Sequence, residues 1–402
     1  MKYLVLLGDG MAGLPLDELD GKTVLQYART PNLDYLASHG TMGLARTVPE
    51  GMPPGSDVAN LSVLGYDPRK YYTGRAPLEA AAMGLPLEPD DVAYRCNLVT
   101  LAGLENGYES SVMEDFSAGH ISTDEARALV HELEQRLGQH GVSFHPGVSY
   151  RHLMLWKGGE DGAVCTPPHD ITGKPVRGHL PSGPGADFLL GMMKASVDAI
   201  SGHEVNRKRT ASGKSKANSI WLWGQGKKPA LPAFKERYNI SGAMISAVDL
   251  LKGIAATLGM KVIEVPGATG YIDTDYKGKA RAALSALDAA DFVYVHVEAP
   301  DEAGHGGNLR HKVQAVEDFD EKVVGTVLNA VKGKPGFRVL SMPDHPTPIK
   351  IKSHTSDPVP FVLWDSGKDE QINNSKYDEA AAAGTGLLIE EGWKLIDRLL
   401  EP

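Results

Sequence analysis

Short runs of apolar residues alternate with longer segments of helical periodicity through most of the chain. Between several of these runs, apolar residues recur every three or four positions, which places them on one face of a helix. Because strands that alternate with helices usually pair in parallel, the pattern predicts an α/β fold with a mostly parallel sheet sandwiched by helices. Seven runs have the composition of buried strands: Tyr3–Leu7, Ala93–Leu101, Ser219–Trp223, Lys261–Val265, Phe292–Val297, Arg338–Met342 and Phe361–Trp364.

Helix-end signals accompany several of the periodic segments. Thr30 is expected to cap a helix that begins at Pro31 and continues over Leu33–Ser38. Ser122 and Glu125 have the spacing of a capping box at the start of another helix. Further helices are predicted over Val58–Leu64, Val248–Leu258 and Leu387–Leu400, the last of these as a terminal amphipathic helix.

The regular alternation breaks between about Asn106 and Asn218, where loops rich in glycine and proline interrupt it. We therefore predict a discontinuous domain formed by residues 1–89 and 219–402, with a second domain, residues 90–218, inserted into it. The basic, polar stretch at residues 207–218 is interpreted as the linker that returns from the insert.

Charge and composition indicate which kinds of binding partner the protein is expected to have. Among 402 residues, 41 lysines and arginines stand against 51 aspartates and glutamates, a net charge of −10. Nucleic acids and anionic membranes are themselves negative, so neither is expected as a partner. No apolar run approaches the length of about 18 residues needed to span a membrane, and the N-terminal run is too short for a signal peptide. Cys96 and Cys165 cannot build a disulfide framework, so we expect a cytoplasmic protein.

Acidic residues follow three of the predicted strands. Asp9 comes after the first strand, Asp301 after the run that ends at Val297, and Asp344 after the run that ends at Met342. The carboxyl ends of parallel strands share one edge of the sheet, which is where open α/β folds bind their ligands. Each motif alone is also typical of a turn or a surface pair. Because a carboxylate follows each of three strands, we interpret the three aspartates as parts of a single site.

Histidines accompany two of these aspartates. His305 lies four residues after Asp301, His345 directly follows Asp344, and His354 lies nearby. Carboxylate and imidazole ligands without thiolates suit Mn²⁺, Zn²⁺ or Mg²⁺. The ligands exceed the needs of one ion, and two adjacent ions would clamp the attacking and leaving oxygens of a phosphoryl transfer.

Ser56 allows two interpretations. It follows a loop rich in glycine and proline and precedes a helical pattern, so on sequence alone a helix N-cap is the favoured assignment. The same position suits a nucleophile, because unpaired N–H groups at a helix N-terminus attract phosphate and a neighbouring dication would activate the hydroxyl. The two roles are compatible.

Several motifs occur together in a characteristic order along the chain: Gly8-Asp9-Gly10, Thr30-Pro31-Asn32-Leu33-Asp34, Pro54-Gly55-Ser56-Asp57, Tyr72-Thr73-Gly74-Arg75, Trp221-Leu222-Trp223-Gly224-Gln225-Gly226, Ile245-Ser246-Ala247-Val248-Asp249-Leu250, Asp301 with His305, Asp344-His345, and His354. The combination resembles the alkaline phosphatase superfamily and, within it, the archaeal-type branch of the cofactor-independent (2,3-bisphosphoglycerate-independent) phosphoglycerate mutases. The resemblance implies an alkaline-phosphatase-like domain with a smaller α/β domain inserted into it.

The resemblance also implies roles for individual residues. Two divalent ions, Mn²⁺ before Zn²⁺ or Mg²⁺, replace 2,3-bisphosphoglycerate as the cofactor, and Ser56 is transiently phosphorylated. One ion is held by Asp301, His305 and His354, and the other by Asp9, Ser56, Asp344 and His345. His120 and Asp170 are expected to assist transfer, and the substrate anion is expected to contact Arg75, Lys235 and Arg207.

The implied activity is the interconversion of 2-phosphoglycerate and 3-phosphoglycerate in glycolysis and gluconeogenesis, which makes a small phosphorylated hydroxy acid the expected partner. Three alternatives stay open on the sequence: a homoserine kinase-like phosphotransferase with the same core, a metal-dependent phosphatase or sulfatase, and a metal-binding scaffold without activity. The sequence does not indicate the oligomeric state.

Overall fold

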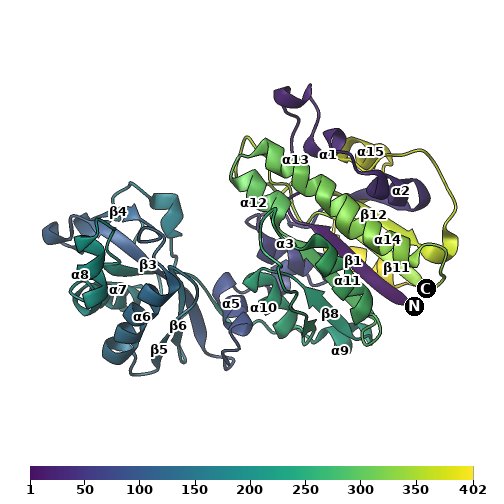
Figure 1. Cartoon of the computed structure of the whole chain (residues 1–402). Coiled ribbons are helices and arrows are strands. Elements are labelled where there is room, and N and C mark those ends of the chain that lie inside the picture. The colour runs from purple at the N-terminus through teal and green to yellow at the C-terminus, as the bar shows by residue number, and fades with distance from the viewer. Residues whose placement is uncertain (402) are drawn as a thin grey trace. The chain divides into compact units, whose positions relative to one another are not determined.

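The computed structural model describes residues 1–401, and the chain divides into two compact units (Figure 1). Unit 1 comprises Met1–Tyr72 and the chain from Ala230 onward, and unit 2 comprises Thr73–Pro229. Unit 2 therefore extends beyond the predicted insert of residues 90–218 at both ends. The reason is packing, because α5 (Arg75–Ala82) contacts two strands of unit 2, one of which ends only at Lys227.

Unit 1 is built on an eight-stranded sheet in the order β13-β2-β12-β11-β1-β10-β8-β9. All of its strands run in the direction of β1 except β12, which is antiparallel to both of its neighbours. The prediction of a mostly parallel sheet is confirmed. The strands are β1 (Lys2–Gly8), β2 (Thr41–Ala45), β8 (Gly242–Ile245), β9 (Lys261–Val262), β10 (Phe292–Val297), β11 (Phe337–Met342), β12 (Val359–Asp365) and β13 (Leu388–Ile389).

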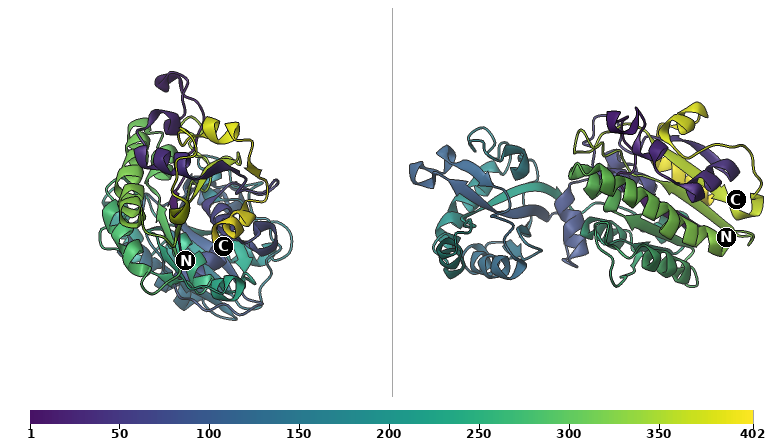
Figure 2. Two further views of the ribbon diagram at one scale, coloured as in Figure 1. Left: turned by 90° about the vertical axis from the view of Figure 1, so that its right-hand side faces the viewer. Right: turned by 45° about the horizontal axis from the view of Figure 1, so that its top comes forward.

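Helices cover both faces of this sheet, as the two further views show (Figure 2). The central strands are therefore buried on both sides, and every residue of β10 is buried. One face carries α2 (Pro31–His39), α11 (Tyr276–Ala286), α12 (Ala299–His305), α13 (Leu309–Asp318), α14 (Gly325–Val331) and a π-helical turn, Phe319–Val324, between the last two. The other face carries α3 (Ser56–Val63), α10 (Asp249–Thr257) and α16 (Leu395–Leu400). The remaining helices of unit 1 are α1 (Val24–Tyr27), α4 (Pro68–Tyr71), α9 (Phe234–Tyr238) and α15 (Glu379–Gly384).

The prediction of one helix over Leu387–Leu400 is wrong in its first half. Leu388 and Ile389 form β13 and pair with β2, so the α-helix starts only at Leu395. Gly392 passes against the end of β2, where its amide donates to Arg46 O and a Cβ would lie 2.3 Å from that oxygen. The apolar residues that were assigned to one helix thus belong to a short strand and to a separate helix.

Unit 2 is a five-stranded antiparallel sheet covered by helices. Its long central strand, β3 (Val92–Ala102), pairs with β4 (Val112–Asp115), β6 (Arg151–Trp156) and β7 (Ser219–Lys227), and β5 (Val142–His145) pairs with β6. The helices α6 (Thr123–Leu137), α7 (Ala186–Ile200) and α8 (Glu204–Ala211) complete the unit. The capping box at Ser122 and Glu125 is confirmed at the start of α6.

The predicted return linker is wrong, because the first residues of the 207–218 stretch belong to α8. Arg209 is buried, and its guanidinium donates to Glu125 Oε2 at 2.8 Å, to Ala118 O at 2.6 Å and to Ser215 O at 2.8 Å. This stretch is therefore part of the packed unit. Among residues 1–401, no helix has both the length and the apolar character required to cross a bilayer.

Candidate active site

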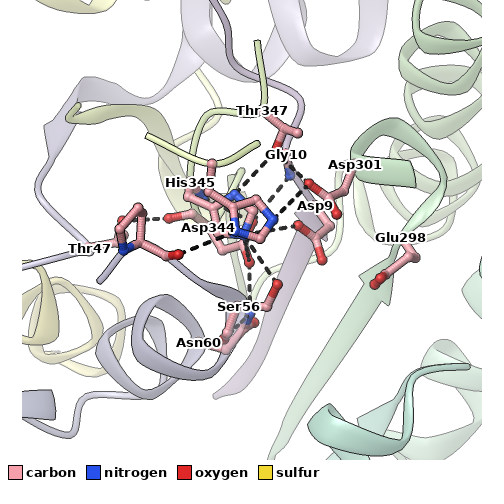
Figure 3. A network of polar contacts seen from close by, with 12 residues as sticks. Asp9, Gly10, Thr47, Ser56, Asn60, Glu298, Asp301, Asp344, His345 and Thr347 are labelled. Carbon is pink, nitrogen blue, oxygen red and sulfur yellow. Dashed lines mark hydrogen bonds and ion pairs between the residues drawn. The ribbon is translucent and has the colours of Figure 1, made fainter. Parts of the chain in front are cut away.

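The three strand-end aspartates converge in unit 1 because β11, β1 and β10 are neighbours in the sheet. Asp9 directly follows β1, Asp344 follows β11, and Asp301 lies in α12 just after β10. All three side chains are buried (Figure 3). Gly10 lets the chain turn between them, because its φ of +61° suits glycine and a Cβ would lie 2.6 Å from Asp301 Oδ1.

One group consists of Asp301, His305 and His354. His305 Nε2 lies 3.2 Å from Asp301 Oδ2, His354 Nε2 lies 3.5 Å from Asp301 Oδ1, and the two histidine nitrogens are 2.8 Å apart. Burial alone would raise the pKa of Asp301, but hydrogen bonds from both histidines outweigh it and hold that pKa well below its usual value. The hydrogen bond to Asp301 raises the pKa of His305 to about 9. Three ligand atoms this close could hold a metal ion.

A second group surrounds His345. Its Nε2 atom lies 3.3 Å from Asp344 Oδ2, 3.6 Å from Asp9 Oδ1 and 3.2 Å from Ser56 Oγ. Burial, followed by repulsion from Asp344 and Asp301, raises the pKa of Asp9 well above its usual value. The group therefore concentrates negative charge that a bound cation would neutralise, and Asp9, Asp301 and His345 have the spacing of metal ligands.

Ser56 is the first residue of α3, and Gly55, not Ser56, occupies the N-cap position. The N-cap interpretation is therefore wrong. The Ser56 hydroxyl contacts His345 instead of a backbone amide of its own helix (Figure 3). This places a hydroxyl directly beside the cluster of carboxylates and imidazoles.

Two predicted site residues of unit 2 lie in one patch. Arg75 Nε and Arg95 Nε bind the two oxygens of Glu79 at 3.2 Å and 3.0 Å. Asp170 Oδ1 lies 3.7 Å from His169 Nε2. The Trp223 ring joins the two pairs, because the Arg95 guanidinium lies 4.2 Å from its centroid and the His169 ring lies 5.3 Å from it. Burial lowers the pKa of His169, Asp170 opposes this, and the charges of Arg95 and Arg75 lower the pKa further.

His120 joins this patch through aromatic contacts. The ring of Phe116 lies 6.4 Å from the His120 ring and 6.1 Å from the His169 ring, between centroids. The His120 ring also packs edge-to-face on Tyr150 at 5.9 Å. Unit 2 thus gathers His120, Arg75 and the neighbourhood of Asp170 on one surface.

The other two predicted substrate residues lie elsewhere. Arg207 donates to Gly202 O at 2.9 Å on the exposed side of α8, in a pocket shared with Glu132 and Arg136. Lys235 is exposed on α9, which packs through Phe234 on Phe292, the first residue of β10. The site lies at the opposite, carboxyl end of that strand. The predicted contacts of Arg207 and Lys235 with the substrate anion stay predictions.

The chain has close relatives along its whole length. It is 54% identical to a protein of Geobacter sulfurreducens named as a probable 2,3-bisphosphoglycerate-independent phosphoglycerate mutase, and 52% identical to the enzyme of that name from Methanosarcina barkeri, with both chains covered completely in each comparison. A family model described as 2,3-bisphosphoglycerate-independent phosphoglycerate mutase matches residues 37–206. The chain belongs to this family.

Solved structures agree with this membership and confirm the predicted fold class. A protein from Pyrococcus horikoshii is similar with a TM-score of 0.82 at 29% identity, covering 99% of this chain and 97% of the other. A cofactor-independent phosphoglycerate mutase from Thermoplasma acidophilum is similar with a TM-score of 0.66 at 27% identity, covering 100% and 99%.

The structure adds polar residues that the sequence interpretation missed. Asn60 donates to Asp344 Oδ2 at 2.8 Å and to Ser56 O at 2.9 Å, and accepts from Tyr294 at 2.5 Å. The Thr347 hydroxyl donates to Asp301 (Figure 3). The helical spacing of four residues between Ser56 and Asn60 was the available signal.

His296 and Glu298 are also close to the site. His296 Nε2 lies 2.8 Å from Asp9 Oδ2 and 3.5 Å from Glu298 Oε2. Both residues lie at the carboxyl end of β10, the type of position that identified the three aspartates as candidates. His296 was interpreted only as a member of an apolar strand.

Proposed function

We propose that this phosphoglycerate mutase family member interconverts 2-phosphoglycerate and 3-phosphoglycerate through a phosphoserine at Ser56. The observation that carries the proposal is the contact of 3.2 Å between Ser56 Oγ and His345 Nε2, inside a buried group of carboxylates and imidazoles. A hydroxyl beside such a group is in the position that a metal-activated nucleophile requires.

The donor set fits divalent cations. Asp9 Oδ1 is buried and has no hydrogen-bond partner among the described residues, so this oxygen is available as a ligand atom. In this proposal Asp301, His305 and His354 hold one ion, and the second is held by Asp9, Ser56, Asp344 and His345. Mixed oxygen and imidazole ligands suit Mn²⁺, Zn²⁺ and Mg²⁺. We propose Mn²⁺ first, as expected from the family resemblance.

The chemistry that bound ions supply is a lower pKa for the Ser56 hydroxyl and neutralisation of charge on the transferring phosphoryl group. In the first step the Ser56 Oγ–P bond forms, the P–O bond to glycerate breaks, and the proton lost by Ser56 is balanced by one gained on the released oxygen. In the second step the other glycerate hydroxyl gives up its proton and attacks phosphorus, and Ser56 regains a proton.

Unit 2 contributes a cationic surface in this proposal. Arginine offers a planar pair of donors that matches a carboxylate, and the partly exposed Arg75 lies there beside the buried Arg95, with His169 and Asp170 nearby. We assign to this surface the binding of the glycerate carboxylate, with His120 and Asp170 as candidate proton carriers. Excluding water from bound phosphoserine favours transfer over hydrolysis.

The test compares Ser56→Ala with Ser62→Ala, a matched control in the same helix whose hydroxyl donates to Thr47 O. After reconstitution with Mn²⁺, conversion of 3-phosphoglycerate is followed with an enolase-coupled assay, and phosphoserine is trapped by acid quench and located by mass spectrometry. We expect Ser56→Ala to lose both signals and Ser62→Ala to keep them. Near-normal mutase turnover in Ser56→Ala contradicts the covalent mechanism.

A parallel assay replaces phosphoglycerate with homoserine and ATP. We expect no turnover there. Phosphorylation of homoserine without mutase activity would reject the substrate while leaving Ser56 as the nucleophile.

A further inference from the structure

The hydroxyl group of Thr347 lies between two residues that the proposed function assigns to different ions. It donates a hydrogen bond to Asp301, and its oxygen lies 3.3 Å from His345 Nδ1 (Figure 3). All three side chains are buried, Thr347 and His345 completely. In the proposed function Asp301 holds one ion and His345 holds the other. A single hydroxyl therefore contacts both halves of the site.

The direction of these two hydrogen bonds follows from the chemistry of the groups. A hydroxyl has one proton to donate, and an ionised carboxylate can only accept, so the Thr347 proton goes to Asp301. The oxygen of Thr347 is then the acceptor in its bond with His345, which requires the imidazole proton to be on Nδ1. The lone pair of His345 Nε2 consequently faces Ser56 Oγ, 3.2 Å away, where a metal ligand is needed.

The backbone of Thr347 is held from two sides. Its N–H donates to Ala12 O at 3.1 Å, and its carbonyl accepts from the ammonium group of Lys312, which is completely buried. Gly10 leaves the space that the side chain occupies, because a Cβ at Gly10 would lie 2.5 Å from Thr347 Oγ1. Packing that locks a supporting side chain also locks the groups to which that side chain is hydrogen-bonded.

We propose that Thr347 is a positioning residue, which fixes the tautomer of His345 and the orientation of Asp301 and so couples the two ion positions. The inference rests on the proposed function, because the ligand roles of Asp301 and His345 belong to it. Histidines that bind metals usually donate their second N–H to a neighbouring acceptor, and loss of such a partner costs about 10- to 100-fold in metal affinity. Since one hydroxyl here serves a ligand of each ion, its removal should weaken both.

The test compares two substitutions at this position. Thr347→Val replaces the hydroxyl by a methyl group of similar size, and Thr347→Ser keeps the hydroxyl. Thr257→Val makes the first change in α10, where the hydroxyl donates to Gly253 O at 2.8 Å, and serves as the matched control. Binding of Mn²⁺ to the metal-free, full-length proteins is measured by isothermal titration calorimetry.

A second measurement locates the imidazole proton directly. The wild-type protein is labelled with ¹⁵N-histidine and loaded with Zn²⁺, which is diamagnetic, and the protonated nitrogen of His345 is identified by nuclear magnetic resonance. His345→Gln assigns the signal. We expect the proton on Nδ1, and a proton on Nε2 overturns the proposal without the need for any variant at Thr347.

We expect Thr347→Val to bind Mn²⁺ about 10- to 100-fold more weakly at both positions, and Thr347→Ser and Thr257→Val to bind it as the wild type does. Wild-type affinity in Thr347→Val, or an equal loss in Thr347→Ser, overturns the role of the hydroxyl. A loss at one position only overturns the coupling of the two ions.

The proposed function is tested separately by phosphoserine trapping in the wild type. A wild-type protein that binds Mn²⁺ and carries the His345 proton on Nδ1, but forms no phosphoserine, rejects the covalent mechanism and leaves the positioning role of Thr347 in place. The opposite combination, phosphoserine with the proton on Nε2, rejects only the role of Thr347.

Discussion

Replacement of Asn60 by leucine tests whether the buried polar network around Ser56 is organised as described. Leucine has a similar volume, so the change removes hydrogen bonds without leaving a large cavity. Asn60 is fully buried and makes three hydrogen bonds, to Asp344 Oδ2, to Ser56 O and from Tyr294. In the variant all three partners lose their bond inside the protein.

The expected cost follows from these contacts. A hydrogen bond to a charged group contributes about 1.5–3 kcal/mol and a bond between neutral groups about 0.5–1.5 kcal/mol. One bond of the first kind and two of the second give a loss of about 4 kcal/mol in the free energy of unfolding. Because Asn60 orients Asp344, we also expect Mn²⁺ affinity to fall by roughly 10- to 100-fold.

The assay is urea denaturation of the metal-free protein, followed by titration of the folded protein with Mn²⁺. Tyr294→Phe serves as the control, because it removes only the hydroxyl that donates to Asn60. We expect Tyr294→Phe to cost about 1 kcal/mol in the wild type and less in the Asn60→Leu background, since the two groups share one bond. An Asn60→Leu protein within about 1 kcal/mol of the wild type, with unchanged Mn²⁺ affinity, refutes this account.

Three further predictions concern other features. Arg209→Leu should lower the stability of unit 2 by about 2–4 kcal/mol, because it removes the bond to the partly exposed Glu125 and leaves two carbonyl groups without their donor. The exposed Arg207→Leu should change the stability by less than about 0.5 kcal/mol in the same denaturation experiment. Burial lowers the pKa of His152 to about 3, so the folded state binds fewer protons than the unfolded state between pH 6.5 and 3. The free energy of unfolding should therefore fall on acidification through that range, by up to about 1.4 kcal/mol per pH unit. In His152→Gln this slope should flatten, and an unchanged slope assigns it to other groups. Chelation of divalent ions should speed hydrogen exchange in the central strands of unit 1 and leave β3 of unit 2 unaffected, because all proposed ligands lie in unit 1. Equal acceleration in both units would contradict the placement of the ions in unit 1.

Local pattern was sufficient for the central strands and for the carboxylates that follow them. A strand buried on both faces reads as a continuous apolar run, so Phe292–Val297 was predicted with the bounds that the structure has. Strand direction then determines that Asp9, Asp301 and Asp344 reach one edge. Short strands toward the two ends of the sheet carry a weaker signal, and β2, β8 and β13 were not predicted.

Local pattern also misassigned residues whose partners lie far away along the chain. Thr30 is at the N-cap of α2, but its side chain makes no capping bond. The carboxylate of Asp320 accepts from the amides of Asn32 and Leu33 instead, at 3.2 Å and 2.7 Å. A cap supplied from 288 residues away leaves no trace in the local sequence.

The amino-acid sequence by itself determined the family, the α/β class and the set of strand-end aspartates and histidines, because each depends on residue types at short spacing. Tertiary structure decided which groups act together. It turned the Ser56 hydroxyl toward His345, placed His296 and Glu298 beside Asp9, and moved Lys235 to the far end of β10. The physical reason is that contact between side chains depends on how distant elements pack, and the period of a single helix or strand does not specify that.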